Sequence, residues 1–137
     1  MLRPERNYIF EMPMQVRDYE LDSQGIVNNA VYLHYLGHTR HEFCRKAGTS
    51  FRDMQKQGVD PVLRSVEIEY LRSLKSGDRF VSRLGFCREG ARFIFRQDIF
   101  TLDDDMPVVR ADITVVCLEN GRLTRGDVLA AAFADFL

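Results

Sequence analysis

The chain has 137 residues, of which 45% are hydrophobic and 28% charged, so we predict one globular domain over residues 1–137. Its formal net charge of −1 argues against a general nucleic-acid binder, which needs a basic surplus. No apolar run approaches the ~20 residues of a membrane span, and the N-terminus lacks the apolar segment of a signal peptide. We therefore expect a cytoplasmic protein.

The N-terminal half of the sequence predicts one strand and one long helix. Residues 8–16 read as a strand, and Pro13 within it indicates a sheet edge or a bulge. A polar loop follows over residues 17–28. Apolar residues at helical spacing then predict a helix over residues 30–47, which Gly48 ends. Apolar residues cover so much of its first two turns that we expect a sheet to wrap it.

The remaining sequence reads mainly as strands. Residues 49–57 predict a second, short helix, and the tail over residues 126–137 predicts another helical segment. The predicted strands between them cover residues 62–70, 79–88, 92–102 and 106–118. Because tight turns join successive strands, we expect antiparallel hairpins. The predicted fold class is α+β, with five strands packed around one long helix.

The polar loop carries an acid, Asp22, three residues before Gly25 and just ahead of the predicted helix start. A helix N-terminus offers free backbone N–H groups and partial positive charge, which can hold the oxyanion formed by attack on a carbonyl. Taken by its spacing, Asp22 has two interpretations: a catalytic acid or base, or an Asx-turn residue. Gly25 predicts a tight turn or a positive φ.

The segment DSQGIVNNAVY at residues 22–32, with RHEF at 40–43, resembles the hotdog-fold acyl-CoA thioesterases of the hydroxybenzoyl-CoA thioesterase type. Its VNNAVY portion is also similar to acyl-ACP thioesterases. VEIEYL at residues 66–71, followed by SGD at 76–78, resembles the second strand and turn of that family. The resemblance implies a hotdog fold, an antiparallel sheet of five or more strands around one long central helix. It also implies a homodimer or homotetramer with the active site at the subunit interface.

The resemblance also implies roles for individual residues. It makes Asp22 the base or nucleophile and assigns the backbone N–H of Asn29 to the thioester carbonyl, although the Asn29 side chain is alternatively only a helix cap. Gly25 and Tyr32 would border the substrate, Tyr32 alternatively being a core or interface residue. The implied substrate is an acyl-CoA, or alternatively an acyl-ACP, hydrolysed without metal or cofactor. A non-catalytic acyl-thioester-binding protein of this fold is the other alternative, whereas Ile26, where many relatives have His, disfavours a dehydratase.

Several arginines are candidates for the phosphates of coenzyme A. Arg88, Arg92 and Arg96 flank a predicted turn, and arginine is a good phosphate partner, although solvated strand ends are the alternative. Further candidates of the same kind are Arg72 and Lys75. Glu20 precedes Asp22 by two residues and is most simply a solvated acid.

Histidine and cysteine spacing gives no metal site. The histidines at 34, 38 and 41 share one helix face, but the glutamate of a zinc-protease motif is absent, so we expect a polar helix surface or a subunit interface. The cysteines at 44, 87 and 117 are far apart and without metal-ligand spacing, so we expect free buried thiols.

Overall fold

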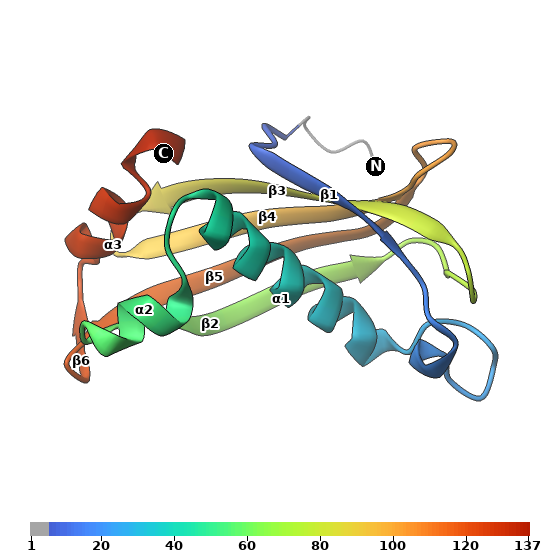
Figure 1. Cartoon of the computed structure of the whole chain (residues 1–137), viewed down its shortest axis with the longest axis horizontal. Helices are drawn as coiled ribbons and strands as arrows, with labels where there is room; N and C mark the ends of the chain where they lie inside the picture. The colour runs from blue at the N-terminus through green and yellow to red at the C-terminus, as the bar shows by residue number, and fades with distance from the viewer. Residues whose placement is uncertain (1–5) are drawn as a thin grey trace.

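A computed structural model describes residues 6–137, which form one antiparallel sheet with helices against one face (Figure 1). Residues 1–5, part of the stretch considered above for a signal peptide, lie outside that range. The strands are β1 (Phe10–Gln15), β2 (Val59–Tyr70), β3 (Arg79–Glu89), β4 (Arg92–Thr101), β5 (Pro107–Glu119) and β6 (Arg122–Thr124). The helices are α1 (Asn29–Lys46), α2 (Phe51–Lys56) and α3 (Asp127–Ala132), with 3-10 turns η1 (Asp18–Glu20) and η2 (Ala134–Phe136). The predicted α+β class is confirmed, while β6 was missed.

The strand order is β1-β3-β4-β5-β2, with β6 on β5. Pro13 lies in β1, which among the described strands pairs with β3 alone, so the predicted edge position is confirmed. The predicted hairpin after β2 is wrong, because β2 pairs with β5 and residues 71–78 cross over to β3. The physical reason is Leu74, which is 1% exposed and whose carbonyl accepts the Val27 N–H at 2.9 Å. The crossover segment thus packs against the start of α1 instead of turning back.

Helix α1 begins and ends where its capping residues place it. The side chain of Asn28 accepts the Ala30 N–H at 2.9 Å, and Gly48 adopts φ +85° just past the last turn. One face of the helix is buried against the sheet, and it carries Tyr32, Tyr35, Leu36, Thr39, Phe43 and Cys44. The opposite face is open, with Leu33 39% exposed, so the sheet covers less of the helix than we expected.

Buried polar groups fix α1 on the sheet. The Thr39 and Ser82 hydroxyls lie 2.7 Å apart. Gln97 donates its amide to the Leu36 carbonyl at 2.9 Å and accepts from the Arg40 guanidinium at 2.9 Å. Because buried polar groups need partners, these bonds define where the helix sits on β3 and β4.

The C-terminal end of α1 is packed with aromatic rings. Phe43 is fully buried and stacks on Phe133, with 5.6 Å between ring centroids. Phe86, Phe95 and Phe136 lie 6.1, 6.4 and 5.1 Å from it. Phe133 follows α3 and Phe136 belongs to η2, so the C-terminal segment closes this end of the core (Figure 1).

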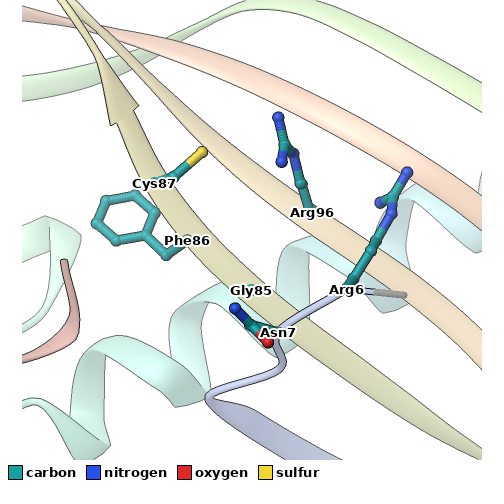
Figure 2. Close-up of a pocket in the computed structure, with 6 residues that line it drawn as sticks. All are labelled: Arg6, Asn7, Gly85, Phe86, Cys87 and Arg96. Carbon is teal, nitrogen blue, oxygen red and sulfur yellow. The ribbon is translucent and has the colours of Figure 1, made fainter. Parts of the chain in front are cut away.

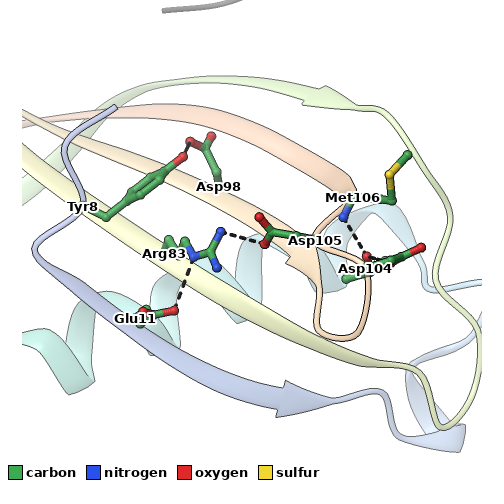
Figure 3. A network of polar contacts seen from close by, with 8 residues as sticks. Tyr8, Glu11, Arg83, Asp98, Asp104, Asp105 and Met106 are labelled. Carbon is green, nitrogen blue, oxygen red and sulfur yellow. Dashed lines mark hydrogen bonds and ion pairs between the residues drawn. The ribbon is translucent and has the colours of Figure 1, made fainter. Parts of the chain in front are cut away.

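The outer face of the sheet carries charged contacts. Tyr8 donates a hydrogen bond to Asp98, which is fully buried (Figure 3). Arg6 and Arg110 each approach the same carboxylate at 3.3 Å. These contacts fasten the segment before β1 across the sheet. The same face carries ion pairs of Arg83 with Glu11 and Asp105 (Figure 3).

The three cysteines are unpaired, as predicted. Cys44 and Cys117 are buried, and Cys87 is half-buried. Burial raises the pKa of the Cys44 thiol to about 12, so this thiol stays protonated at neutral pH. Within residues 6–137, no helix has the length and apolar character needed to cross a bilayer.

Candidate active site

The loop between β1 and α1 folds into a small hairpin. Leu21 and Val27 form an isolated antiparallel bridge. The Asp22 N–H donates to the Ile26 carbonyl at 2.8 Å, and the Gly25 N–H donates to the Asp22 carbonyl at 3.1 Å. Gly25 adopts φ +77°, which confirms the predicted positive φ and explains the glycine. The hairpin brings Asp22 next to the start of α1.

Asp22 is half-buried at the mouth of this hairpin. Its Oδ1 accepts the backbone N–H of Gln24 at 2.8 Å and that of Ile26 at 3.4 Å. The Asx turn that we weighed as an alternative is therefore present. It uses only one carboxylate oxygen, because no hydrogen bond to Oδ2 is found in the described part of the chain. The second oxygen remains able to accept a proton or attack a carbon.

Asn29 is the first residue of α1, and its backbone N–H has no partner among residues 6–137. The neighbouring donors are occupied: the Ala30 N–H binds the Asn28 side chain, and the Val31 N–H binds the Asn28 carbonyl at 2.9 Å. The cap is thus Asn28, which excludes the interpretation of the Asn29 side chain as the cap. The geometry leaves one free donor at the positive end of the helix.

A cavity of about 180 Å³ opens beside this donor. It is lined by Ile26, Val27, Asn29, Tyr32, Tyr70, Leu71, Arg72 and Ser73. The hairpin, the first turn of α1 and the end of β2 with its crossover each supply part of the wall. Leu71 and Ser73 were missed because a hairpin was predicted after β2. The signal was present in Leu74, an apolar residue with polar neighbours on both sides, Ser73 and Lys75.

Tyr32 is 3% exposed and connects α1 to β2 and to the crossover segment that follows it. Its hydroxyl accepts the Leu74 N–H at 3.2 Å, and its ring lies 5.6 Å from that of Tyr70. Burial raises the pKa of Tyr32, and the Asp22 carboxylate acts in the same direction. Tyr70 donates to the Asn29 carbonyl at 3.2 Å, so the edge strand contacts the helix start.

Glu20 is buried, 7% exposed, and the expectation of a solvated acid is wrong. Its Oε1 accepts from the Arg17 N–H at 2.8 Å and from the Tyr35 hydroxyl at 2.7 Å. Its carbonyl accepts the Asn28 N–H at 3.0 Å. Glu20 therefore ties both ends of the hairpin to α1. Burial, and to a smaller extent the hydrogen bond to Glu20, raises the pKa of Tyr35 above its usual range.

The predicted arginines lie away from this cavity. Arg88 donates to the Arg125 carbonyl and to Asp127, both at 2.7 Å, and so holds the C-terminal segment. Arg92 begins β4 and lies far from the cavity. The cavity residue Tyr70 pairs with Val109, which pairs with Ile99 near the other end of β4. Seven residues of strand at ~3.3 Å each place Arg92 about 23 Å from Ile99.

Arg96 lines a second cavity of about 210 Å³ with Arg6 and Cys87 (Figure 2). Arg96 is also 3.7 Å from Glu89. Within a single chain, Arg88, Arg92 and Arg96 therefore do not lie beside Asn29, and their contact with coenzyme A stays a prediction. Arg72, in contrast, borders the Asn29 cavity, and no ion pair involves it within residues 6–137.

The histidines at positions 34, 38 and 41 are exposed on the open face of α1. His41 packs edge-to-face against Phe51 with 5.1 Å between ring centroids. These side chains take no part in the cavity.

Residues 16–136 match the Thioesterase-like superfamily. The chain belongs to this family. Over 111 residues it is 39% identical to the acyl-acyl carrier protein thioesterase ATL2, chloroplastic, of Arabidopsis thaliana. That match covers 80% of this chain but only 59% of the plant protein, so the chain spans less than two thirds of that relative. It is 24% identical over 116 residues to the acyl-CoA thioesterase YbgC of Haemophilus influenzae, covering 83% of this chain and 84% of that protein.

The fold of the chain is similar to that of solved thioesterase structures. Slr0204, a 1,4-dihydroxy-2-naphthoyl-CoA thioesterase from Synechocystis, superposes with a TM-score of 0.84. The superposition covers 92% of this chain and 96% of that one at 19% identity, a likeness that shows the fold alone. Together with the six-stranded sheet and its central helix, it confirms the predicted hotdog fold.

Proposed function

We propose that the chain hydrolyses acyl thioesters, with Asp22 as base or nucleophile and the Asn29 N–H as oxyanion donor. One observation carries the proposal: the hairpin that holds Asp22, whose Oδ2 has no partner in the described residues, runs directly into the helix start, where the Asn29 N–H, also without a partner there, borders the cavity. Asp22 itself is not among the residues that line the cavity, but its backbone N–H binds the carbonyl of Ile26, which does line it. Membership of the thioesterase-like family supports the same reaction.

The chemistry follows from these two groups. The thioester carbonyl oxygen binds the Asn29 N–H, which polarises the carbonyl. As a base, Asp22 takes a proton from water, and the water oxygen attacks the carbonyl carbon. The oxyanion then collapses, the C–S bond breaks, and the leaving sulfur takes the proton from Asp22. As a nucleophile, Asp22 instead bonds to the carbonyl carbon while the C–S bond breaks, which gives an anhydride and a thiolate. Water then cleaves the anhydride, which restores the Asp22 carboxylate, and a proton released in that step neutralises the thiolate.

The test is Asp22→Asn, measured with a panel of acyl-CoA substrates and a thiol reagent. The amide oxygen still accepts in the Asx turn, so we expect folding to persist while kcat falls roughly a hundredfold or more. Asp103→Asn makes the same change at an exposed acid of a distant loop and serves as control. Near-wild-type turnover by Asp22→Asn contradicts the mechanism. Saturable binding without thiol release by the wild-type chain supports the non-catalytic alternative.

The carrier on the substrate is coenzyme A in our proposal, with acyl carrier protein as the second candidate. Arg72 at the cavity wall offers one guanidinium, whose planar set of donors suits a phosphate of the substrate. The 39% identity to an acyl-acyl carrier protein thioesterase favours the second candidate. Measuring kcat/KM for the same acyl group on both carriers separates them. A tenfold or greater preference for the carrier protein overturns the coenzyme A assignment.

We also propose a homodimer, or a tetramer built from it, formed through β2. Strand β2 pairs only with β5 among the described strands, and its free edge is a template for another strand. Val62 and Leu63 on it are 40% and 48% exposed. Tyr70, the last residue of β2, and Leu71, which follows it, line the cavity, so a partner at β2 would cover the site. A cytoplasmic location, in keeping with three unpaired cysteines, is part of the proposal.

A further inference from the structure

The hydroxyl of Tyr32 accepts a hydrogen bond but donates none within residues 6–137. A buried phenol O–H ordinarily has an acceptor, because leaving it without one costs free energy. The other tyrosines meet this rule: Tyr8 donates to Asp98, Tyr35 to Glu20 and Tyr70 to the Asn29 carbonyl, while Tyr19 is 79% exposed to water. Tyr32 is thus the exception among the tyrosines, and it borders the candidate site.

The position of this hydroxyl is fixed by its acceptor role. The Leu74 N–H occupies one lone pair of the phenol oxygen at 3.2 Å. The Leu74 carbonyl accepts the Val27 N–H, so the same residue anchors both the hairpin and Tyr32. The ring is held between Tyr35 and Tyr70, with centroids 6.0 and 5.6 Å away. A group fixed in this way presents its O–H in a defined direction, as an oxyanion donor must.

Asn29 and Tyr32 therefore both line one cavity, and each carries a donor, the Asn29 N–H and the Tyr32 O–H, for which no acceptor is found within residues 6–137. A carbonyl oxygen has two lone pairs and takes two hydrogen bonds. Burial raises the pKa of Tyr32, which keeps the phenol protonated and able to donate at neutral pH.

We propose that Tyr32 is a catalytic residue whose O–H donates the second hydrogen bond to the thioester carbonyl oxygen, beside the Asn29 N–H. The assignment rests on the proposed thioester hydrolysis. It gives the phenol two simultaneous tasks, accepting from Leu74 to hold the crossover segment and donating to the developing oxyanion. The ring alone serves packing, and phenylalanine would supply it.

The first experiment replaces Tyr32 by phenylalanine. Removing one oxyanion donor lowers kcat by roughly 10² to 10³-fold, and KM stays within about threefold because the bond strengthens mainly in the transition state. Tyr19→Phe removes an exposed phenol hydroxyl and is the matched control, with wild-type kcat expected. A kcat for Tyr32→Phe within about twofold of wild type overturns the proposal.

Tyr32→Phe also removes the hydrogen bond from the Leu74 N–H, and this loss by itself lowers stability. A second experiment therefore keeps the hydroxyl in place. Fluorotyrosines incorporated at position 32 keep the ring and hydroxyl, while ring fluorination makes the O–H a stronger donor and a weaker acceptor. A donor role predicts that kcat rises as the phenol pKa falls. A purely structural acceptor role predicts a flat or falling kcat together with a lower unfolding temperature, and that result overturns the proposal.

Asp22→Asn measured alongside separates the two levels of inference. Absence of thiol release by the wild-type chain contradicts the proposed hydrolysis itself, and full activity of Asp22→Asn contradicts the proposed role of Asp22. An inactive Asp22→Asn combined with a fully active Tyr32→Phe leaves the hydrolysis standing and removes only the role of Tyr32.

Discussion

The two ends of α1 are built from opposite chemistry. At the C-terminal end, Phe43 is fully buried among the rings of Phe86, Phe95 and Phe133. At the N-terminal end, Asn29 is exposed and its N–H faces a cavity without a partner in the described chain. Burial of apolar area stabilises a fold by about 25 cal/mol per Å². The aromatic end therefore contributes stability that offsets the cost of hydrogen-bonding groups left without protein partners at the polar end. The difference separates scaffold from site along a single helix.

The sharpest test of this division removes the ring at the aromatic end. Phe43→Ala leaves a cavity in a fully packed region and should lower the free energy of unfolding by about 3–5 kcal/mol. Leu33→Ala on the same helix truncates a side chain that is 39% exposed, and we expect a change of about 0.5 kcal/mol or less. Denaturant unfolding measures both. Equal losses for the two variants would show that the aromatic end is no special source of stability.

The next largest effect concerns the free edge of β2, beside the polar end. Leu63→Glu places like charges close together in the proposed dimer, which should weaken association roughly a hundredfold or more. Activity should fall with the dimer fraction, because the partner is expected to cover the cavity. Leu123→Glu makes the same change on β6, where the side chain is 67% exposed. Light scattering combined with turnover decides: a fully active monomer contradicts an interface site.

A smaller effect is expected from loosening the hairpin at the polar end. Glu20→Ala leaves the Arg17 N–H and the Tyr35 hydroxyl without their acceptor, which costs about 1–3 kcal/mol. Displacement of Asp22 should lower kcat about tenfold at temperatures where the variant stays folded. Glu20→Gln retains an acceptor oxygen and should recover most of the activity. If the two variants lose kcat equally, Glu20 acts through its charge and not through positioning.

Much of the fold was predictable because local signals agree with the final structure. Helical spacing and capping residues predicted α1, and Pro13 predicted the edge position of β1. The β2–β3 crossover was not predictable from turn chemistry. Gly77 does adopt φ +82° in a local turn, but whether the strands on either side pair depends on a non-local contact, the packing of Leu74 beneath α1.

The candidate site divides in the same way. Asp22 drew attention because it lies in the same short stretch as Gly25 and the helix start, and the family resemblance supplied the roles of Asp22 and Asn29, which stay predictions. Leu71 and Ser73 come from the crossover and were missed with it. The burial of Glu20 was also missed, since its partner Tyr35 lies about two helix turns beyond the loop and nothing local points to that bond.

The smallest effect compares two arginines that the fold places in different cavities. Arg72 borders the Asn29 cavity, so Arg72→Ala should raise KM about fivefold, the scale of one exposed charge pair, with kcat nearly unchanged. Arg96 lines the cavity shared with Arg6 and is paired with Glu89, and in a single chain it lies away from Asn29 (Figure 2). The sequence-based prediction is that Arg96→Ala raises KM through a lost phosphate contact. A larger KM increase for Arg96→Ala than for Arg72→Ala would mean that the phosphates lie across the sheet and not at the polar end of α1.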